Sequence, residues 1–120
     1  MGEPFKDLVV WQIAVQLSQA IYTLTASFPD FERFGLTNQL RRASVSVASN
    51  IAEGYGRSTK GEYLLFLGHA RGSNCELQTR LIISNGLGFG KAPARREAEG
   101  LSEEVSRMLV AIMSKLQKRG

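Results

Sequence analysis

Hydrophobic residues recur at helical spacing along the chain and divide it into four segments. In the first, about residues 7–27, apolar positions alternate four and three residues apart, which is a heptad-like seam. The members of this seam are Val10, Ala14, Leu17, Ile21, Leu24 and Phe28. Because Leu8, Trp11 and Val15 widen the apolar stripe, the pattern favours a helix in a bundle over a two-stranded coiled coil.

The second segment, about residues 36–53, carries two apolar strips on roughly opposite sides of a predicted helix. One strip consists of Leu36, Leu40, Ala43, Val47 and Ile51, and the other, mostly apolar, of Arg41, Val45, Ala48 and Ala52. A surface helix of a small monomer needs one such strip, so the second predicts contact with a further helix or chain. Glycines at positions 54, 56 and 61 are expected to break this helix into a loop.

The third helix is predicted over about residues 60–85, because Thr59 and Glu62 form a capping box at its start. One face of this helix consists of Tyr63, Leu67, Ala70, Leu77 and Leu81. Gly68 and Gly72 lie a turn apart on another face. With Leu65 and Ile83 on that face, they leave a shallow groove for a neighbouring helix.

A fourth helix is predicted over about residues 93–117, since proline is acceptable in a first turn. Its inner face consists of Leu101, Val105, Met108, Ile112 and Leu116, and Gly100 is expected to kink or delay it. Strand-like alternation is absent from the sequence. The predicted fold is therefore all-α, one antiparallel four-helix-bundle domain over residues 1–120, assembling as a ring-like homo-oligomer.

Composition places the chain among ordinary globular proteins, with 43% hydrophobic and 22% charged residues in 120. No run approaches the roughly 18 apolar residues of a membrane span, so a cytoplasmic location is expected. The single cysteine, Cys75, excludes an intrachain disulfide and is expected to be a small buried hydrophobe. Phe31 and Phe34 are expected to cover one end of the core. Trp11 is interpreted as a core or interface anchor, with a base-stacking platform as the alternative.

The residues do not assemble a catalytic or metal-binding pattern, and no cofactor or metal is expected. The only histidine, His69, shares a stripe with Glu62 and Glu76, but steps of seven residues are about 10 Å, too far apart for one ion. Gly56 and Gly61 have the spacing of a phosphate loop, yet Glu62 and Tyr63 stand where that loop needs Lys and Ser or Thr. An enzyme is not predicted.

Net charge is +4, with a pI near 9.6, and arginine supplies ten of the fifteen positive residues. Such a balance favours acidic partners, and the planar guanidinium suits phosphate. The candidates for nucleic-acid binding are Arg41, Arg57, Lys60, Lys91, Arg95 and Arg96. A second set, interpreted as a structural polar network within or between subunits, consists of Arg42, Asn50, Glu53 and Glu76.

Three runs resemble one known family: F-x-D-L-x-V-W-Q (5–12), F-P-x-x-E-R-F-G-L-x-x-Q-L-R-R-A (28–43) and N-I-A-E-G-x-G-R (50–57). The chain is similar over roughly residues 5–116 to the 23S rRNA intervening-sequence proteins, also called the S23 family. The resemblance implies a bacterial, cytosolic four-helix bundle that forms a ring-like homopentamer. Relatives serve as accessory proteins of diversity-generating retroelements, where a basic barrel contacts nucleic acid and a reverse transcriptase.

For most members of the family no biochemical function is established, so two hypotheses are carried. The first is a non-enzymatic oligomer that binds RNA or DNA phosphates without reading sequence. The second is a structural or protein-binding oligomer whose arginines serve subunit interfaces. A small-molecule site in the bundle or ring centre is a third, weaker option.

Overall fold

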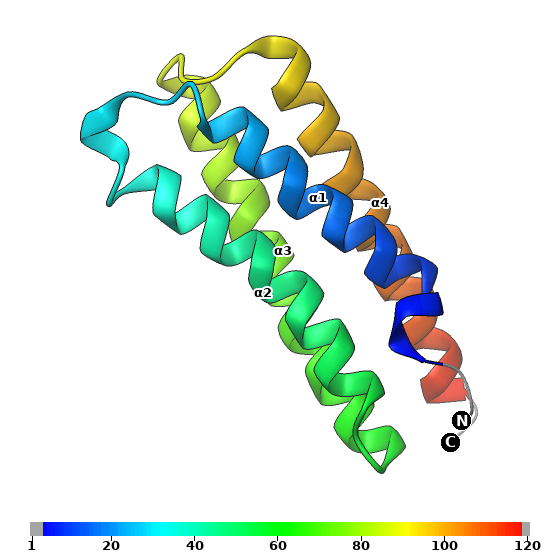
Figure 1. Ribbon diagram of the computed structural model, residues 1–120. Coiled ribbons are helices and arrows are strands. Elements are labelled where there is room, and N and C mark those ends of the chain that lie inside the picture. Colours follow the sequence, from blue (N-terminus) through cyan, green and yellow to red (C-terminus); the bar gives the residue numbers. More distant parts are fainter. Residues whose placement is uncertain (1–3, 119–120) are drawn as a thin grey trace.

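The computed structural model describes residues 4–118, in which four long helices form a bundle whose successive members run in opposite directions (Figure 1). The elements are η1 (Phe5–Asp7), α1 (Val9–Thr25), η2 (Asp30–Glu32), α2 (Leu36–Tyr55), α3 (Lys60–Gly86) and α4 (Ala92–Lys118). Helices α1 and α3 each pack against both α2 and α4, so α1 and α3 lie diagonally across the bundle. The molecule measures 46 × 20 × 20 Å.

The four long helices begin and end within two residues of the predicted positions. The glycines behave differently from the prediction. Gly54 lies inside α2, Gly61 lies in the first turn of α3, and only residues 56–59 form the loop. Gly100 does not interrupt α4, which is continuous. Packing of long amphipathic helices outweighs the low helix propensity of single glycines.

The core lies along the bundle axis and contains most of the predicted inner faces of α1, α2 and α3. On α4, Val105 of the predicted face is buried, whereas Leu101, Met108, Ile112 and Leu116 pack partly buried against the core and Leu109, which was not predicted, is fully buried. All six members of the α1 seam are buried, as are four of the five residues of the first α2 strip. The largest fully buried side chains are Leu17, Ile21, Leu24, Leu40, Ile51, Leu67, Leu77, Leu81 and Leu109. Burial of this apolar surface is the main force that holds the four helices together.

A polar pair that the sequence did not indicate lies inside this core, between α3 and α4. The side-chain amide of Asn74 donates to the Ser102 backbone carbonyl at 2.9 Å, and the Ser102 hydroxyl donates to Asn74 Oδ1 at 2.7 Å. Both residues are buried. Because each satisfies the other, the pair avoids the cost of an unpaired buried polar group and fixes the register of α3 against α4.

Three side chains expected inside lie outside. Cys75 is exposed, because its position on α3 faces away from the inner residues of that helix. Phe31 and Phe34 are 78% and 84% exposed. The end of the core is instead covered by buried Phe28 against Phe89, whose ring centroids are 5.7 Å apart. Phe31 touches this pair only at the edge, with its ring 6.0 Å from that of Phe89.

Candidate nucleic-acid interface

The predicted phosphate-binding residues lie toward opposite ends of the bundle. Lys91 directly precedes α4, and Arg95 and Arg96 lie in its first turns. At the other end of the bundle, Arg57 lies in the α2–α3 loop and Lys60 is the first residue of α3 (Figure 1). The 27 residues of α3 separate the two groups. At 1.5 Å per residue, this separation is roughly 40 Å. A single chain therefore does not bring the six predicted residues to one surface.

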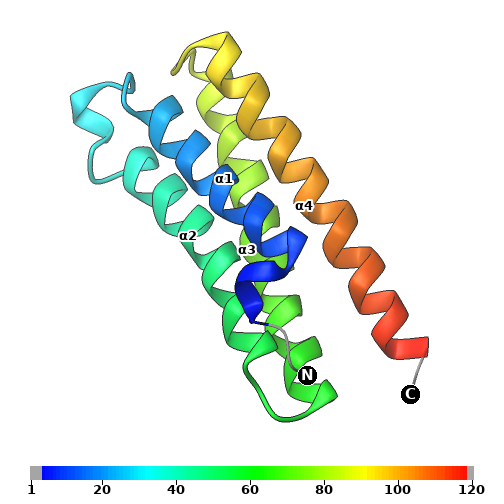
Figure 2. The ribbon, with the colours of Figure 1, turned by 45° about the vertical axis from the view of Figure 1, so that its right-hand side comes forward.

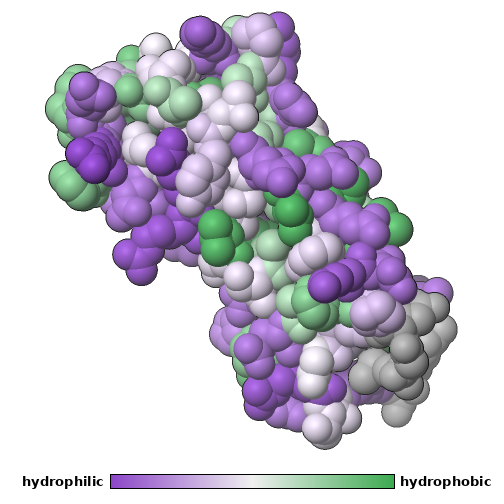
Figure 3. Space-filling model, viewed as in Figure 1, coloured by the Kyte–Doolittle hydropathy of each residue, from purple (hydrophilic) through white to green (hydrophobic). Residues whose placement is uncertain are grey.

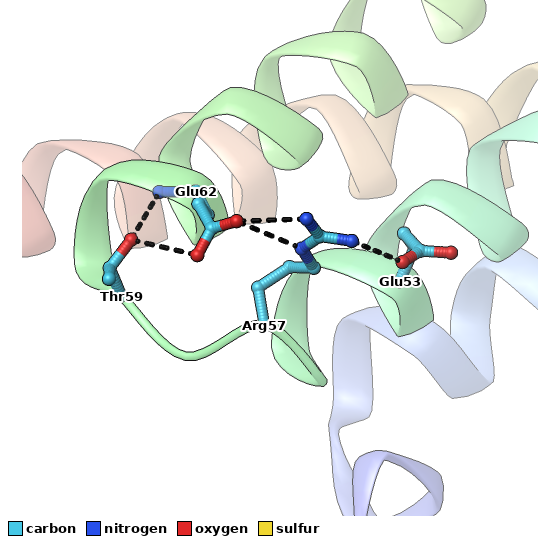
Figure 4. Close-up of polar contacts among 4 residues, drawn as sticks. All are labelled: Glu53, Arg57, Thr59 and Glu62. Carbon is cyan, nitrogen blue, oxygen red and sulfur yellow. Dashed lines mark hydrogen bonds and ion pairs between the residues drawn. The ribbon is translucent and has the colours of Figure 1, made fainter.

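Arg57 is held by two carboxylates (Figure 4). Its Nε and Nη2 donate to Glu62 Oε2 at 3.2 and 2.9 Å, and its Nη1 donates to Glu53 Oε2 at 3.2 Å. The guanidinium carbon also lies 5.3 Å from the centre of the Phe66 ring. We call these four residues the Arg57 cluster. It connects the end of α2 to the first turns of α3.

The capping box fixes the second carboxylate of this cluster. The Glu62 backbone N–H donates to Thr59 Oγ1 at 3.1 Å, and the Thr59 hydroxyl donates to Glu62 Oε1 at 3.2 Å. Hydrogen bonds from Arg57, and then from Thr59, lower the pKa of Glu62 below its ordinary value. The same contacts, Glu62 first and Glu53 second, raise the pKa of Arg57. Three of the five N–H donors of the Arg57 guanidinium therefore already bind carboxylates, with which a phosphate would compete.

Arg41 is also engaged within the chain. Its Nε donates to the buried Thr25 hydroxyl at 2.9 Å, and its guanidinium stacks over Tyr22 at 4.6 Å from the ring centre. These contacts tie α2 to α1. Arg41 still borders an open groove whose lining is Tyr22, Asn38, Arg41, Arg42, Val45 and Ser46. It is half-buried, while Arg42 beside it is exposed.

The remaining candidates present their charges to solvent. Lys60, Lys91 and Arg96 are exposed, and Arg95 is half-buried. Within residues 4–118 the ion pairs involve only Arg57 and Arg80. The basic group of Lys91, Arg95 and Arg96, which we call the α4 basic end, is therefore without an ion-pair partner in the described part of the chain.

Of the four residues interpreted as a polar network, Asn50, Glu53 and Glu76 make separate contacts inside one chain. Asn50 donates to the carbonyl and hydroxyl of Ser46 at 2.9 and 3.0 Å, Glu53 belongs to the Arg57 cluster, and Glu76 pairs with Arg80 at 3.6 Å. Arg42 makes no side-chain hydrogen bond to another described residue. A link among these residues across subunits stays a prediction.

The second apolar strip of α2 borders a surface groove between α1 and α2. The groove is lined by Trp11, Val15, Ser18 and Gln19 from α1 and by Val45, Ala48, Ser49 and Ala52 from α2. Figure 3 views the face that carries these two helices and shows hydrophobic residues exposed along its middle, with hydrophilic residues on either side. Trp11 is half-buried, with its ring edge-on to Phe5 at 5.2 Å. We call this feature the α1–α2 groove.

The described residues also bear on a metal site and on a membrane-spanning segment. Within residues 4–118, no three His, Cys, Asp or Glu side chains gather where they could hold a metal ion. His69 is exposed, with its ring 5.7 Å from that of Phe66. None of the helices described between those limits combines the length and hydrophobicity that membrane crossing needs.

Comparison with known proteins gives a family and a fold. The family model for the 23S rRNA-intervening sequence protein matches residues 6–111. A solved structure from Bacteroides thetaiotaomicron, a protein of unknown function from the S23 ribosomal protein family, has a TM-score of 0.78 and 18% sequence identity. The alignment covers 88% of this chain and 98% of that one. At this identity the likeness establishes the shared fold. No curated protein matches the chain.

Proposed function

The chain belongs to the family of 23S rRNA-intervening sequence proteins, and from this premise we propose that it is a non-enzymatic bundle protein that binds RNA or DNA phosphates. It assembles as a homo-oligomer, a ring of about five copies as the family resemblance implies, and acts in the cytoplasm. Basic side chains supply the affinity, and contacts to the phosphates alone do not read sequence.

The observation that carries this proposal is the state of the α4 basic end. Lys91, Arg95 and Arg96 lie within six residues at the start of α4 and form no ion pair with described residues. The first backbone N–H groups of a helix are unpaired and add positive potential at the same place. Arg57, by contrast, is already paired with two carboxylates of its own chain.

The test measures binding of a fluorescent 20-nucleotide RNA by anisotropy across a range of salt concentrations. Each phosphate contact steepens the log–log salt dependence by roughly 0.7 for single strands and 0.9 for duplex DNA. The variant Lys91→Ala/Arg95→Ala/Arg96→Ala should lower the slope by about two for each copy that touches the strand.

A matched control carries the same charge change at the opposite end of the bundle: Lys6→Ala/Lys115→Ala/Lys118→Ala, all at exposed positions. This control should keep the wild-type slope. Equal losses in both triple variants would show that net charge, and not the α4 basic end, attracts the RNA. A wild-type protein that binds neither RNA nor DNA at low salt would refute the proposal.

The α1–α2 groove favours a second candidate function, a structural or protein-binding oligomer without nucleic acid. Val45 is 45% exposed at the rim of this groove, where another chain would cover it. The occupant in this case is a second copy or a protein such as a reverse transcriptase. An oligomer that ignores RNA, and that Ala48→Glu dissociates without loss of helix content, would support this candidate.

A further inference from the structure

Helix α3 has two heptad-spaced faces on opposite sides, and only one of them packs inside the bundle. The inner face contains Leu67, Ala70, Asn74, Leu77 and Leu81, all buried. A second series, offset by two residues and so by roughly 200°, points outward. Its members, which we call the outer α3 seam, are Gly61, Leu65, Gly68, Gly72, Cys75, Thr79, Ile82 and Gly86.

The outer α3 seam has the composition of a helix interface rather than of a solvated face. Its spacing alternates four and three over 26 residues, and no member is charged. Seven members are exposed and Gly68 is half-exposed. Leu65 and Ile82 are 56% and 70% exposed. In the described part of the chain α3 packs only against α2 and α4, so the outer seam is left uncovered.

The glycines of the seam have no packing reason within one chain. A Cβ added at Gly61, Gly72 or Gly86 would meet nothing within 4 Å, and at Gly68 only Met113 Cε, at 4.0 Å. Gly72 lies in the middle of a 27-residue helix, where glycine is among the least favourable residues. Small residues at helical spacing permit the backbone of a second helix to approach closely. The outer α3 seam is thus a surface on which a second helix could pack closely.

We propose that the outer α3 seam binds the same seam of a second copy, with the two α3 helices antiparallel about a two-fold axis. The seam is self-complementary about its midpoint, between Ser73 and Asn74. In this pairing Leu65 lies opposite Ile82 of the second copy at either end. In the middle, Gly72 lies opposite Cys75 of the second copy, where the backbones come closest. A two-fold contact requires such self-complementarity.

The α3 side chains beside the seam permit this arrangement because none of them meets a like charge. In an antiparallel pair, each flank of one helix meets the same flank of the other. His69 then faces Glu76 of the second copy, and on the other flank Arg71 faces Gln78 of the second copy. No like charges are brought together. The seam is about 38 Å long, enough for most of the length of a bundle of this size to take part.

This pairing rests on the homo-oligomer of the proposed function but uses a different surface from the α1–α2 groove. Helix α3 lies diagonally across the bundle from α1, and in both ribbon views it lies behind α1 and α2 (Figures 1 and 2). One chain can therefore use the groove and the outer seam at once. When that two-fold axis is perpendicular to the axis of the ring and meets it, the assembly becomes two rings back to back.

Cysteine crosslinking tests the pairing directly, because Cys75 is the only cysteine. The variant Gly72→Cys/Cys75→Ser is mixed with wild-type protein under a mild oxidant, so that position 72 of one copy faces Cys75 of the other. The matched control is Ala111→Cys/Cys75→Ser, whose thiol lies at an exposed position on α4. The proposal expects a covalent heterodimer at least tenfold more abundant than with the control. Equal yields overturn it.

Light scattering separates this proposal from the proposed function. Gly72→Arg places a charge in the seam at an exposed position where an added Cβ meets nothing within 4 Å, so the helix content should be unchanged and the particle mass should halve. An unchanged mass overturns the α3 pairing and leaves the oligomer standing. A wild-type monomer overturns both. Crosslinking of Cys75 to Ala48→Cys in the α1–α2 groove would show instead that the seam docks head-to-tail, which also overturns the two-fold pairing.

Discussion

Gly54 is predicted to be required for the close approach of α2 and α3, although its sequence context suggested a helix break. It is buried within the last turn of α2. A Cβ added there would lie 2.8 Å from Phe66 Cβ and 3.2 Å from both Cδ1 and the carbonyl oxygen of Tyr63. Phe66 Cβ and the Tyr63 carbonyl cannot rotate away, so Gly54→Ala forces the two helices apart.

The magnitude follows from two opposing effects. Ordinary contacts begin at 3.4 Å, so the shortest contact must open by 0.6 Å, the difference between 3.4 and 2.8 Å. Overpacking of this kind costs about 1–3 kcal/mol, and the rigid partners place it in the upper half of that range. Replacing glycine by alanine in a helix returns about 1 kcal/mol. The net loss expected for Gly54→Ala is therefore about 1–2 kcal/mol.

The assay is thermal unfolding followed by circular dichroism at one protein concentration, since assembly would make the midpoint concentration-dependent. For a domain of this size the midpoint should fall by roughly 4 °C per kcal/mol. Gly100→Ala is the matched control, because its Cβ meets nothing within 4 Å in mid-α4 and should stabilise by up to about 1 kcal/mol. A Gly54→Ala protein as stable as the control would refute this reasoning.

Two further predictions concern the polar contacts. Because the folded-state pKa of Glu62 lies below its ordinary value of 4.5, stability should be lost as the pH falls beneath 4.5 and through the lower folded-state pKa. In thermal melts between pH 7 and pH 3, the Glu62→Gln variant should lose less folding stability than the wild type as the pH falls. An identical loss in both proteins would contradict the attribution of this pH dependence to Glu62. Ser102→Ala leaves buried Asn74 Oδ1 without its donor and should cost about 1–3 kcal/mol in urea unfolding. The double variant Asn74→Leu/Ser102→Ala should recover part of that loss, and no recovery would argue against an unpaired Oδ1 as the cause.

The fold was largely predictable because helical spacing fixes which residues face inward. The α1 seam is a clear case, since every residue from Val10 to Phe28 at its spacing is buried. Gly54 marks the limit of such reasoning. A glycine that ends a helix and a glycine that admits a neighbouring helix look the same in one sequence. Only the position of Phe66 in space distinguishes them.

The candidate site was less predictable, because the sequence does not show which charged side chains form ion pairs in the folded chain. Arg57 was predicted to contact phosphate, and the structure adds that Glu53, four residues before it, and Glu62, five residues after it, both accept hydrogen bonds from it. The i,i+4 spacing to Glu53 was a usable signal. Cys75 shows a similar oversight. It lies two residues before Leu77, which places it on the opposite side of α3, whatever its hydrophobicity.

In the run N-I-A-E-G-x-G-R (50–57), one of those that carry the family resemblance, four residues have structural roles. Ile51 is in the core, Gly54 admits α3, and Glu53 with Arg57 ties the α2–α3 corner. These shared residues therefore explain why members of the family have the same bundle fold, but they do not identify a ligand. The proposed phosphate contacts are therefore assigned to charges without an ion-pair partner in the described residues, at the α4 basic end.

The α4 basic end has only three cations, so the proposed affinity for nucleic acid depends on how many copies of the chain assemble. Three unpaired cations neutralise at most three phosphates per chain, which gives a salt slope of only about two for a single strand. A cyclic assembly repeats the α4 basic end once per copy and holds the copies at fixed distances. One strand that spans several copies then gains affinity through effective concentration rather than new contacts. If the protein binds nucleic acid, its affinity should therefore depend on the subunit contacts as strongly as on the arginines.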